Sequence, residues 1–253
     1  MKFAVFIIGP AGVGKTTLCR AFNDYLQSQH INSNHLNLDP ASHDATLTHL
    51  DVRSNWDFDK LMQLYQLGPN GTLMHILSEV SNDKWLADIL DKKLEDDFLI
   101  VDCPGQLEVY IHGTVFGNIL ETFTGLGYRC CVLFLLDSTF LSNKRKLCNG
   151  LTINLCSMVA LPQEIPMVTV FTKMDLAPSF SCLEEAIDST LDQYVGDDPN
   201  LERKYELIQN HGGAPMLSFD INSTDSLRDL FDCCKNILGL EETDFAFNDE
   251  EAS

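Results

Sequence analysis

The chain has 253 residues, 45% of them hydrophobic and 21% charged, which is an ordinary composition for a globular protein with a sizeable buried core. Its 17 basic and 37 acidic residues give a formal net charge of −20, which disfavours direct binding to nucleic acid or anionic lipid. A site for phosphate groups would therefore have to be local, built from backbone amides and one or two lysines.

The cysteines and the apolar runs exclude further classes. Nine scattered cysteines without C-x-x-C spacing argue against a zinc site and against a disulfide scaffold, so we expect reduced thiols. The apolar N-terminal run stops at Gly9, and no stretch approaches the roughly 20 apolar residues that a membrane span needs. We therefore expect a soluble, intracellular protein.

Apolar segments of strand length recur along the chain, with helical patterns between them. The predicted strands are 3–8, 35–38, 98–102, 129–137, 166–172 and 215–219. The predicted helices are about 16–29, 57–66, 73–94, 112–124, 141–160, 182–194, 199–210 and 225–238. Because the strands are continuously apolar rather than alternating, we expect them to be buried on both faces. The alternation predicts an α/β fold with a doubly wound, mainly parallel sheet.

No internal repeat or low-complexity linker divides the chain, so we predict one domain over residues 1–240. Two regions, about 40–97 and 176–212, are longer than simple crossovers and are predicted to be helical insertions. The tail 241–253 carries six acidic residues and no basic one, which is typical of disorder. It is either a solubilising tail or a docking peptide that uses Phe245 and Phe247.

The segment GPAGVGKT, residues 9–16, follows the first predicted strand and opens a helix, which is the context of a phosphate-binding loop. Its glycines let backbone N–H groups converge on phosphate oxygens, and the helix N-terminus favours an anion. Lys15 would reach the β- and γ-phosphates, and the Thr16 hydroxyl would bind Mg²⁺. The residues expected to contact the nucleotide here are Gly12, Val13, Gly14, Lys15, Thr16 and Thr17.

The segment IVDCPGQ, residues 100–106, ends a predicted strand with an aspartate. Asp102 is the expected second anchor for Mg²⁺, and the Gly105 amide could contact a γ-phosphate. Gln106 could orient the attacking water, or could be a solvated residue at the start of a helix. Asp39 in NLDPA, residues 37–41, lies at the same end of the sheet, where it would polarise the water or support the metal. The alternative is that Asp39-Pro40 starts a routine turn.

The segment VFTKMDL, residues 170–176, ends the fifth predicted strand and indicates the base. The Asp175 carboxylate can accept hydrogen bonds from the two adjacent donors of guanine, which adenine lacks. The Lys173 stem can pack along the base, and Thr172 belongs to the same motif. The segment SFD, residues 218–220, follows the sixth predicted strand, where a further base-contacting loop would lie.

The segment LGPNGT, residues 67–72, is favourable for a turn through Gly68, Pro69, Asn70 and Gly71. Asn70 offers donors and an acceptor without charge, which would suit contact with a phosphate. The phosphate loop, NLDPA, GPN, DCPGQ and TKMD, in this order, resemble the GPN-loop GTPases from Met1 to about Leu240. The stretches 96–112 and 171–176 are most similar to the third eukaryotic paralogue, with the second as the alternative.

This resemblance implies a dimeric, Mg²⁺-dependent GTPase related to the signal-recognition and MinD-type NTPases. It implies that the loop Gly68, Pro69 and Asn70 reaches across the dimer toward the partner's nucleotide. It also implies that metal and water are organised by Asp39, Asp102, Gln106 and Glu108. Eukaryotic members act in assembly and nuclear import of RNA polymerase II, usually as pairs of unlike paralogues. The implied partners are therefore a second paralogue or a second copy, with polymerase subunits or assembly factors, in the cytoplasm or shuttling to the nucleus.

The chain departs from the family pattern at three points. Thr172 stands where the base motif commonly begins with asparagine, so the bracing of that loop could differ. Asp51-Val52-Arg53-Ser54 stands where many members read Asp-Ile-Arg-Asp, which puts a salt bridge of the missing acid in doubt. The second lysine of MinD-type phosphate loops is absent, so Lys15, Mg²⁺ and Asn70 would have to compensate charge. Arg53 is either a supplement to them or one half of a surface ion pair.

The function predicted from these motifs is hydrolysis of GTP to GDP and phosphate by a nucleotide switch. The alternative is a nucleotide-stabilised adaptor with little or no turnover. A small-molecule kinase is disfavoured, because such enzymes usually close an arginine-rich lid and this chain has six arginines spread over its length.

Overall fold

The computed structural model describes residues 2–42, 50–82, 84–92, 98–111, 114–177, 182–193, 198–211 and 214–240. Its centre is a sheet of seven parallel strands in the order β3-β2-β4-β1-β5-β6-β7. The strands are β1 (Lys2–Ile8), β2 (Ser33–Asn37), β3 (Leu50–Asp51), β4 (Phe98–Asp102), β5 (Tyr128–Asp137), β6 (Met167–Thr172) and β7 (Met216–Ser218). The sheet order reverses on either side of β1, which places the loop after β1 at a topological switch point.

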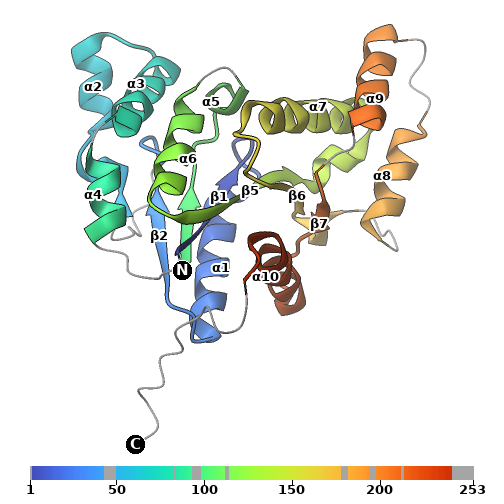
Figure 1. The fold of residues 1–253 in the computed structure, drawn as a ribbon. Helices are drawn as coiled ribbons and strands as arrows, with labels where there is room; N and C mark the ends of the chain where they lie inside the picture. Colours follow the sequence, from blue (N-terminus) through green and yellow to red (C-terminus); the bar gives the residue numbers. More distant parts are fainter. Residues whose placement is uncertain are drawn as a thin grey trace, which may run out of the picture.

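Helices cover both faces of this sheet (Figure 1). One face is covered by α1 (Lys15–Ser28) and α10 (Thr224–Leu238), and the other by α6 (Val115–Gly125) and α7 (Lys144–Ala160). In β1 the side chains of Phe3, Val5 and Ile7 join the α1 side, and those of Phe6 and Ile8 join the α6 side. The predicted doubly wound, parallel α/β fold is confirmed, and the continuous apolar runs have the predicted cause, burial on two faces.

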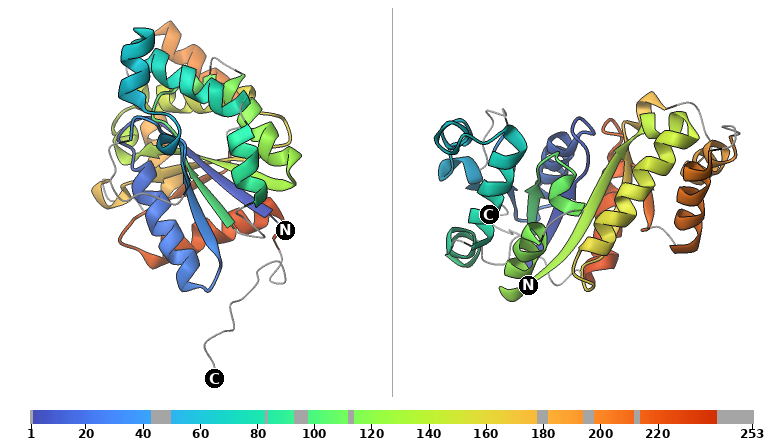
Figure 2. Two further views of the ribbon diagram at one scale, coloured as in Figure 1. Left: turned by 90° about the vertical axis from the view of Figure 1, so that its left-hand side faces the viewer. Right: turned by 90° about the horizontal axis from the view of Figure 1, so that it is seen from above.

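The two predicted insertions carry helices at opposite ends of the sheet (Figures 1 and 2). Beside β2 and β3 lie α2 (Phe58–Tyr65), α3 (Pro69–Asn82) and α4 (Lys84–Lys92). The rings of Trp56 and Trp85 pack edge to face with their centroids 5.1 Å apart, and this contact joins the segment before α2 to α4. Beside β6 and β7 lie α8 (Leu183–Leu191) and α9 (Pro199–His211), and α9 is tied to α7 by an ion pair of 3.2 Å between Arg145 and Asp198.

Several predicted boundaries were wrong. The helix predicted over 73–94 corresponds to α3 and α4, between which lies only residue 83, outside the described residues, and α3 begins earlier than predicted, at Pro69. Strand β3 was missed because two residues carry no periodicity, and it exists only by pairing with β2. The four-residue helix α5 (Glu108–Ile111) was also missed, because it is too short to show a helical period. The predicted helix 141–160 starts later than expected: its first residues belong to a 3-10 turn, and the Asn143 side chain then caps α7 by accepting a hydrogen bond from Lys146 N.

Two other predictions concern the described residues as a group. The nine cysteines are all free, six of them buried. Within the described ranges, no helix combines the length and the apolar character that crossing a bilayer would require. The acidic tail 241–253, with Phe245 and Phe247, lies outside the described residues.

Candidate nucleotide site

The loop between β1 and α1 has the backbone geometry of a phosphate-binding loop. Gly9 has a φ of 140°, and a Cβ atom at this position would stand 2.6 Å from the carbonyl oxygen of Leu135. Gly14 caps the N-terminus of α1 with a φ of 97°. Both positions therefore require glycine, one for close approach to β5 and one for its left-handed conformation. The consequence is an open loop of backbone N–H groups at the positive end of α1.

Lys15 folds back over this loop. Its Nζ donates hydrogen bonds to the carbonyl oxygens of Gly9, at 3.2 Å, and Pro10, at 3.1 Å. Burial lowers the pKa of Lys15, and the carboxylates of Asp102 and Asp39 oppose this effect. The ammonium group is thus held beside the loop and close to two acidic side chains, as a phosphate-binding lysine has to be.

Thr16 and Asp102 meet at the carboxyl edge of the sheet. Thr16 Oγ1 donates a hydrogen bond of 2.6 Å to Asp102 Oδ2. Burial raises the pKa of Asp102 to about 6, although the Thr16 hydrogen bond and the charge of Lys15 lower it. Leu38 N donates to the Asp102 backbone oxygen at 2.8 Å, so the segment that carries Asp39 runs directly beside this carboxylate. The structure therefore brings together all three side chains of the predicted metal site.

The segment around Asp39 is fixed by a side-chain network. The Asp39 backbone N–H donates to Asn37 Oδ1 at 3.0 Å, and Asp39 Oδ1 accepts from Ala41 N at 3.0 Å. Asn37 Nδ2 in turn donates to the Asp39 backbone oxygen and to Asp51 Oδ2, both at 3.2 Å. Asp39-Pro40 therefore does begin a turn. Because this turn lies beside Asp102, its position is also compatible with the predicted role of Asp39 at the metal or the attacking water.

Arg53 extends this network. Its Nε and Nη2 donate to the two oxygens of Asp51 at 3.0 and 2.8 Å, and its Nη1 donates to the Ser42 carbonyl at 2.7 Å. Burial raises the pKa of Asp51, but the hydrogen bonds from Arg53 outweigh it and leave that pKa lowered. The ion pair of Arg53 is therefore made with Asp51, and Ser54, in place of the family's acid, donates to the Asp51 backbone oxygen at 2.7 Å.

The segment after β4 lies against the phosphate loop. A Cβ atom on Gly105 would stand 3.0 Å from Ala11 Cα, so the backbones approach closely there. Gln106 Oε1 is buried and has no hydrogen-bond partner among the described residues. Glu108 is exposed at the first position of α5, and that turn is held by Tyr110 OH, which donates to the Pro104 carbonyl at 2.5 Å.

The base-binding motif closes on the same loop from the other side. Thr172 Oγ1 donates to the Val13 carbonyl at 2.6 Å, across 159 residues of sequence. Lys173 has a φ of 57°, and its Nζ donates to the Gly12 carbonyl at 2.6 Å. Threonine therefore still braces the motif against the phosphate loop, which answers the doubt raised by the missing asparagine. Asp175 is exposed on the 3-10 turn that follows, and Thr17 is exposed on α1.

Sequence reasoning missed one member of this group, Asp137. Its Oδ2 lies 3.2 Å from Lys173 Nζ, and its Oδ1 caps the following turn at Thr139 N. The signal was present, because Asp137 ends the apolar strand β5 just as Asp102 ends β4. The predicted SFD loop lies next to the motif, since Met174 N donates to the Phe219 carbonyl at 3.4 Å.

The GPN segment was predicted as a turn, and this is wrong in its geometry. Pro69 is the first residue of α3, and the Gly68 carbonyl accepts from Thr72 N at 2.9 Å, as in a helix. Proline is common at this position because its fixed φ suits the first helical turn. Asn70 is exposed, and no described residue hydrogen-bonds its side chain. Within one chain the structure therefore does not join Asn70 to the other predicted residues.

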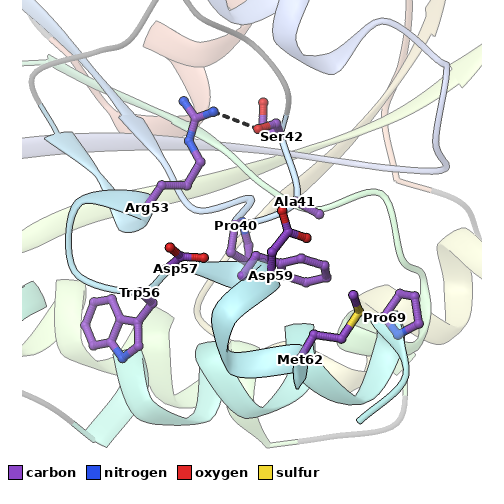
Figure 3. A pocket seen from close by; sticks show the side chains of 10 residues that line it. Pro40, Ala41, Ser42, Arg53, Trp56, Asp57, Asp59, Met62 and Pro69 are labelled. Carbon is purple, nitrogen blue, oxygen red and sulfur yellow. Dashed lines mark hydrogen bonds between the residues drawn. The ribbon is translucent and has the colours of Figure 1, made fainter. Parts of the chain in front are cut away.

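Pro69 does share a pocket with the Asp39 segment (Figure 3). The pocket has a volume of about 420 Å³ and lies between the residues after β2, the 3-10 turn of Arg53 and α2. In Figure 3 the Arg53 side chain turns toward Ser42, while Met62 and Pro69 lie together at the other end. Its lining residues are Pro40, Ala41, Ser42, Arg53, Trp56, Asp57, Phe58, Asp59, Met62 and Pro69.

The fold and this site define a P-loop nucleotide hydrolase of the GTPase class. The crystal structure of an apo GTPase from Pyrococcus abyssi shares the fold with a TM-score of 0.73, at 21% identity, over 92% of this chain and 96% of that one. A family described as "Conserved hypothetical ATP binding protein" matches residues 7–237.

The chain belongs to the GPN-loop GTPase family. A GPN-loop GTPase 3 from Dictyostelium discoideum is 33% identical over 227 residues, which are 87% of this chain and 78% of that protein. A GPN-loop GTPase 3 from Xenopus tropicalis is 31% identical over 261 residues, 97% and 87% of the two chains. A GPN-loop GTPase 2 homolog from Dictyostelium discoideum is 31% identical over 224 residues, 85% and 70%. The resemblance predicted from the motifs is confirmed, and the protein is a nucleotide-binding GTP hydrolase.

Proposed function

We propose that the protein is a dimeric, Mg²⁺-dependent GTPase that converts GTP to GDP and phosphate and acts as a nucleotide switch. The observation that carries this proposal is the 2.6 Å hydrogen bond from Thr16 Oγ1 to Asp102 Oδ2. Lys15 and Asp39 act electrostatically on the same carboxylate. A hydroxyl, two carboxylates and one ammonium group at the head of a glycine-rich loop suit a metal-bound triphosphate.

These side chains fit Mg²⁺ because they offer the oxygen donors that this ion prefers. Thr16 would bind the ion directly, and Asp102 and Asp39 would hold it from two neighbouring strands. When bound, Mg²⁺ would neutralise negative charge on the β- and γ-phosphates. Lys15 would exchange its two carbonyl partners for phosphate oxygens, and Gly12 to Thr17 would surround the phosphates with backbone N–H groups.

The base would bind between the motif after β6 and the phosphate loop. Asp175, exposed on its turn, would accept from the ring N–H and the exocyclic amine of guanine. Asp137 and the Gly12 carbonyl hold the Lys173 ammonium at 3.2 and 2.6 Å, which fixes the direction of the stem that would pack on the base. Thr172 supports both halves of the site through Val13.

Hydrolysis would depend on positioning of the attacking water. Gln106 would orient this water, and its buried Oε1 without a described partner supports that role. Asp39 would polarise the water, Glu108 would assist from the start of α5, and the Gly105 N–H would contact the γ-phosphate. Arg53, which lies in electrostatic range of Asp39, is committed to Asp51 and Ser42, so we expect slow turnover without an arginine finger.

The dimer is proposed from the GPN segment. Gly68, Pro69 and Asn70 would reach the nucleotide of the partner, and Asn70 would contact the γ-phosphate region in trans. Its exposure at the N-terminus of α3 supports a role outside its own chain. The partner would be another GPN-loop paralogue or a second copy of this chain.

The cellular role proposed from the family resemblance is assembly and nuclear import of RNA polymerase II, by a protein that is cytoplasmic or shuttles to the nucleus. This proposal takes residues 1–240 as one GTPase domain with two helical insertions, and residues 241–253 as an acidic extension. Pull-down of polymerase subunits by the GTP-bound protein and not by the GDP-bound protein would support it. Equal pull-down in both states would contradict a switch.

Gln106→Leu tests the chemistry. The variant should keep GTP affinity within about twofold and lose most single-turnover phosphate release, because phosphoryl transfer depends on the position of the attacking water. Wild-type rates from the variant would remove Gln106 from the mechanism. GTP binding by the unaltered dimer without phosphate release would instead favour the adaptor.

A further inference from the structure

A second cluster of chemically reactive side chains lies behind the phosphate loop. One ligand atom each from Cys19, His35 and Asp102 lies within 4.8 Å of the other two. They come from three different elements, α1, β2 and β4, which lie far apart along the chain. Sequence spacing could not reveal this group, because none of its members is a near neighbour of another.

The fold explains why the three side chains meet. His35 pairs in register with Ile100, and Asp102 lies two residues after Ile100, so both point to the α1 face of the sheet. On α1, Cys19 lies one turn after Thr16, and side chains three residues apart share a helix face. Thr16 and Cys19 therefore both face Asp102: the Thr16 hydroxyl hydrogen-bonds its carboxylate, and the Cys19 sulfur lies within 4.8 Å of a carboxylate oxygen.

Two observations distinguish this cluster from an ordinary polar contact in a core. The Nε2 atom of His35 is buried and has no hydrogen-bond partner among the described residues, which is costly for a group that can donate or accept. The cluster also combines a thiol, an imidazole and a carboxylate, which is a donor set that Zn²⁺ accepts and Mg²⁺ does not. A thiolate and a carboxylate together would balance a divalent charge.

We propose that Cys19, His35 and Asp102 form a binding site for a divalent cation of the zinc class, and that this cation and Mg²⁺-GTP exclude one another because both need Asp102. Binding replaces the Cys19 thiol proton, which leaves to solvent as the sulfur–metal bond forms. The three ligand atoms, which lie up to 4.8 Å apart, have to move about 1 Å closer together when the cation binds. Two atoms that are each bonded to one ion at roughly 2.0–2.3 Å lie nearer to each other than 4.8 Å. Asp102, drawn toward the cation, would release the Thr16 hydroxyl.

Cobalt(II) is the probe for the metal site, because a cobalt–thiolate bond gives a charge-transfer absorption band. Titration of the full-length protein with Co²⁺, in the absence of nucleotide, should produce this band, and Zn²⁺ should abolish it. Cys19→Ser and His35→Gln should each lower Zn²⁺ affinity by more than about 100-fold, since loss of an outer-shell contact alone costs 10–100-fold. Cys156→Ser, at an exposed cysteine of α7, should leave affinity unchanged.

The absence of a thiolate band, or a band that survives Cys19→Ser, would overturn the site. His35→Gln is an independent check should Cys19→Ser fail to fold. The second half of the inference rests on the proposed function and has its own readout: saturating Mg²⁺-GTP should abolish the cobalt band. A band unchanged by Mg²⁺-GTP, in protein that binds a fluorescent GTP analogue, would overturn the exclusion. A protein that binds cobalt but no GTP would contradict the proposed function and leave the metal site standing.

Discussion

Two threonines on the same strand, β6, allow a matched test of the contact between the base motif and the phosphate loop. Thr172 Oγ1 is buried and donates to the Val13 carbonyl at 2.6 Å. Thr169 Oγ1 is buried on the same strand and has no hydrogen-bond partner among the described residues. Thr→Val at either position keeps the shape of the side chain and replaces the hydroxyl by a methyl group.

The two substitutions should act in opposite directions. Thr172→Val loses a hydrogen bond and leaves a buried carbonyl unpaired, so the free energy of unfolding should fall by about 1–3 kcal/mol. Thr169→Val removes a buried hydroxyl that gains nothing in return, so the same quantity should stay constant or rise by about 1 kcal/mol. Because the bond from Thr172 also holds the nucleotide loop, its loss should weaken GTP binding by roughly tenfold, at about 1.4 kcal/mol per decade.

Urea denaturation of the nucleotide-free protein measures the first effect, and titration with a fluorescent GTP analogue measures the second. Thr169→Val is the control in both assays. If the two variants change stability and GTP affinity alike, the Thr172 hydroxyl does not brace the loop, and the substitution of the family's asparagine would need another explanation.

Three further predictions concern other parts of the site. Asn70→Ala should slow GTP hydrolysis by the dimer at least tenfold with an unchanged melting temperature, because Asn70 is exposed; a lowered melting temperature with normal hydrolysis would make it a purely structural residue. Arg53→Ala should lower the free energy of unfolding by about 2–3 kcal/mol at pH 7, because the buried Asp51 loses its charged partner. Because the pKa of Asp51 is depressed in the folded protein, its charge stabilises the fold above the unfolded carboxyl pKa of about 3.9. The difference in free energy of unfolding between wild type and Arg53→Ala, measured by urea titration, should therefore shrink as pH falls below that value. A difference that is constant with pH would contradict the role of the Asp51 charge. Gly9→Ala should prevent stable folding, since its Cβ would stand 2.6 Å from a strand carbonyl. Gly117→Ala on α6, with open space around its Cβ, should instead raise the melting temperature. Similar melting behaviour of the two variants in a thermal scan would refute the loop geometry.

The sequence predicted the fold well where physical signals are local. Continuous apolar runs such as Phe98–Asp102 can be satisfied only by burial on both faces, and they all became parallel strands. The two-residue strand Leu50–Asp51 has no such signal, because pairing with β2 creates it. At Pro69 the same residue types favour a turn and a helix start, so the local sequence could not separate them.

The candidate site divides in the same way. Lys15, Thr16 and Asp102 were predictable, because each stands at a fixed place relative to a strand end. The support for the site was not predictable, because it depends on contacts across the chain, such as Thr172 with Val13 over 159 residues. The pairing of Arg53 with Asp51 was open in the sequence, since the two alternatives differ only in where a flexible side chain points.

Phosphate release by the purified protein under single-turnover conditions, with GTP and with ATP, in the presence and absence of Mg²⁺, tests the proposed activity most directly. We expect slow release from GTP that requires Mg²⁺, with at least about 100-fold slower release from ATP, because adenine lacks the paired donors whose hydrogen bonds Asp175 would accept. Equal release from both nucleotides, or release from GTP in the presence of a chelator, would contradict it.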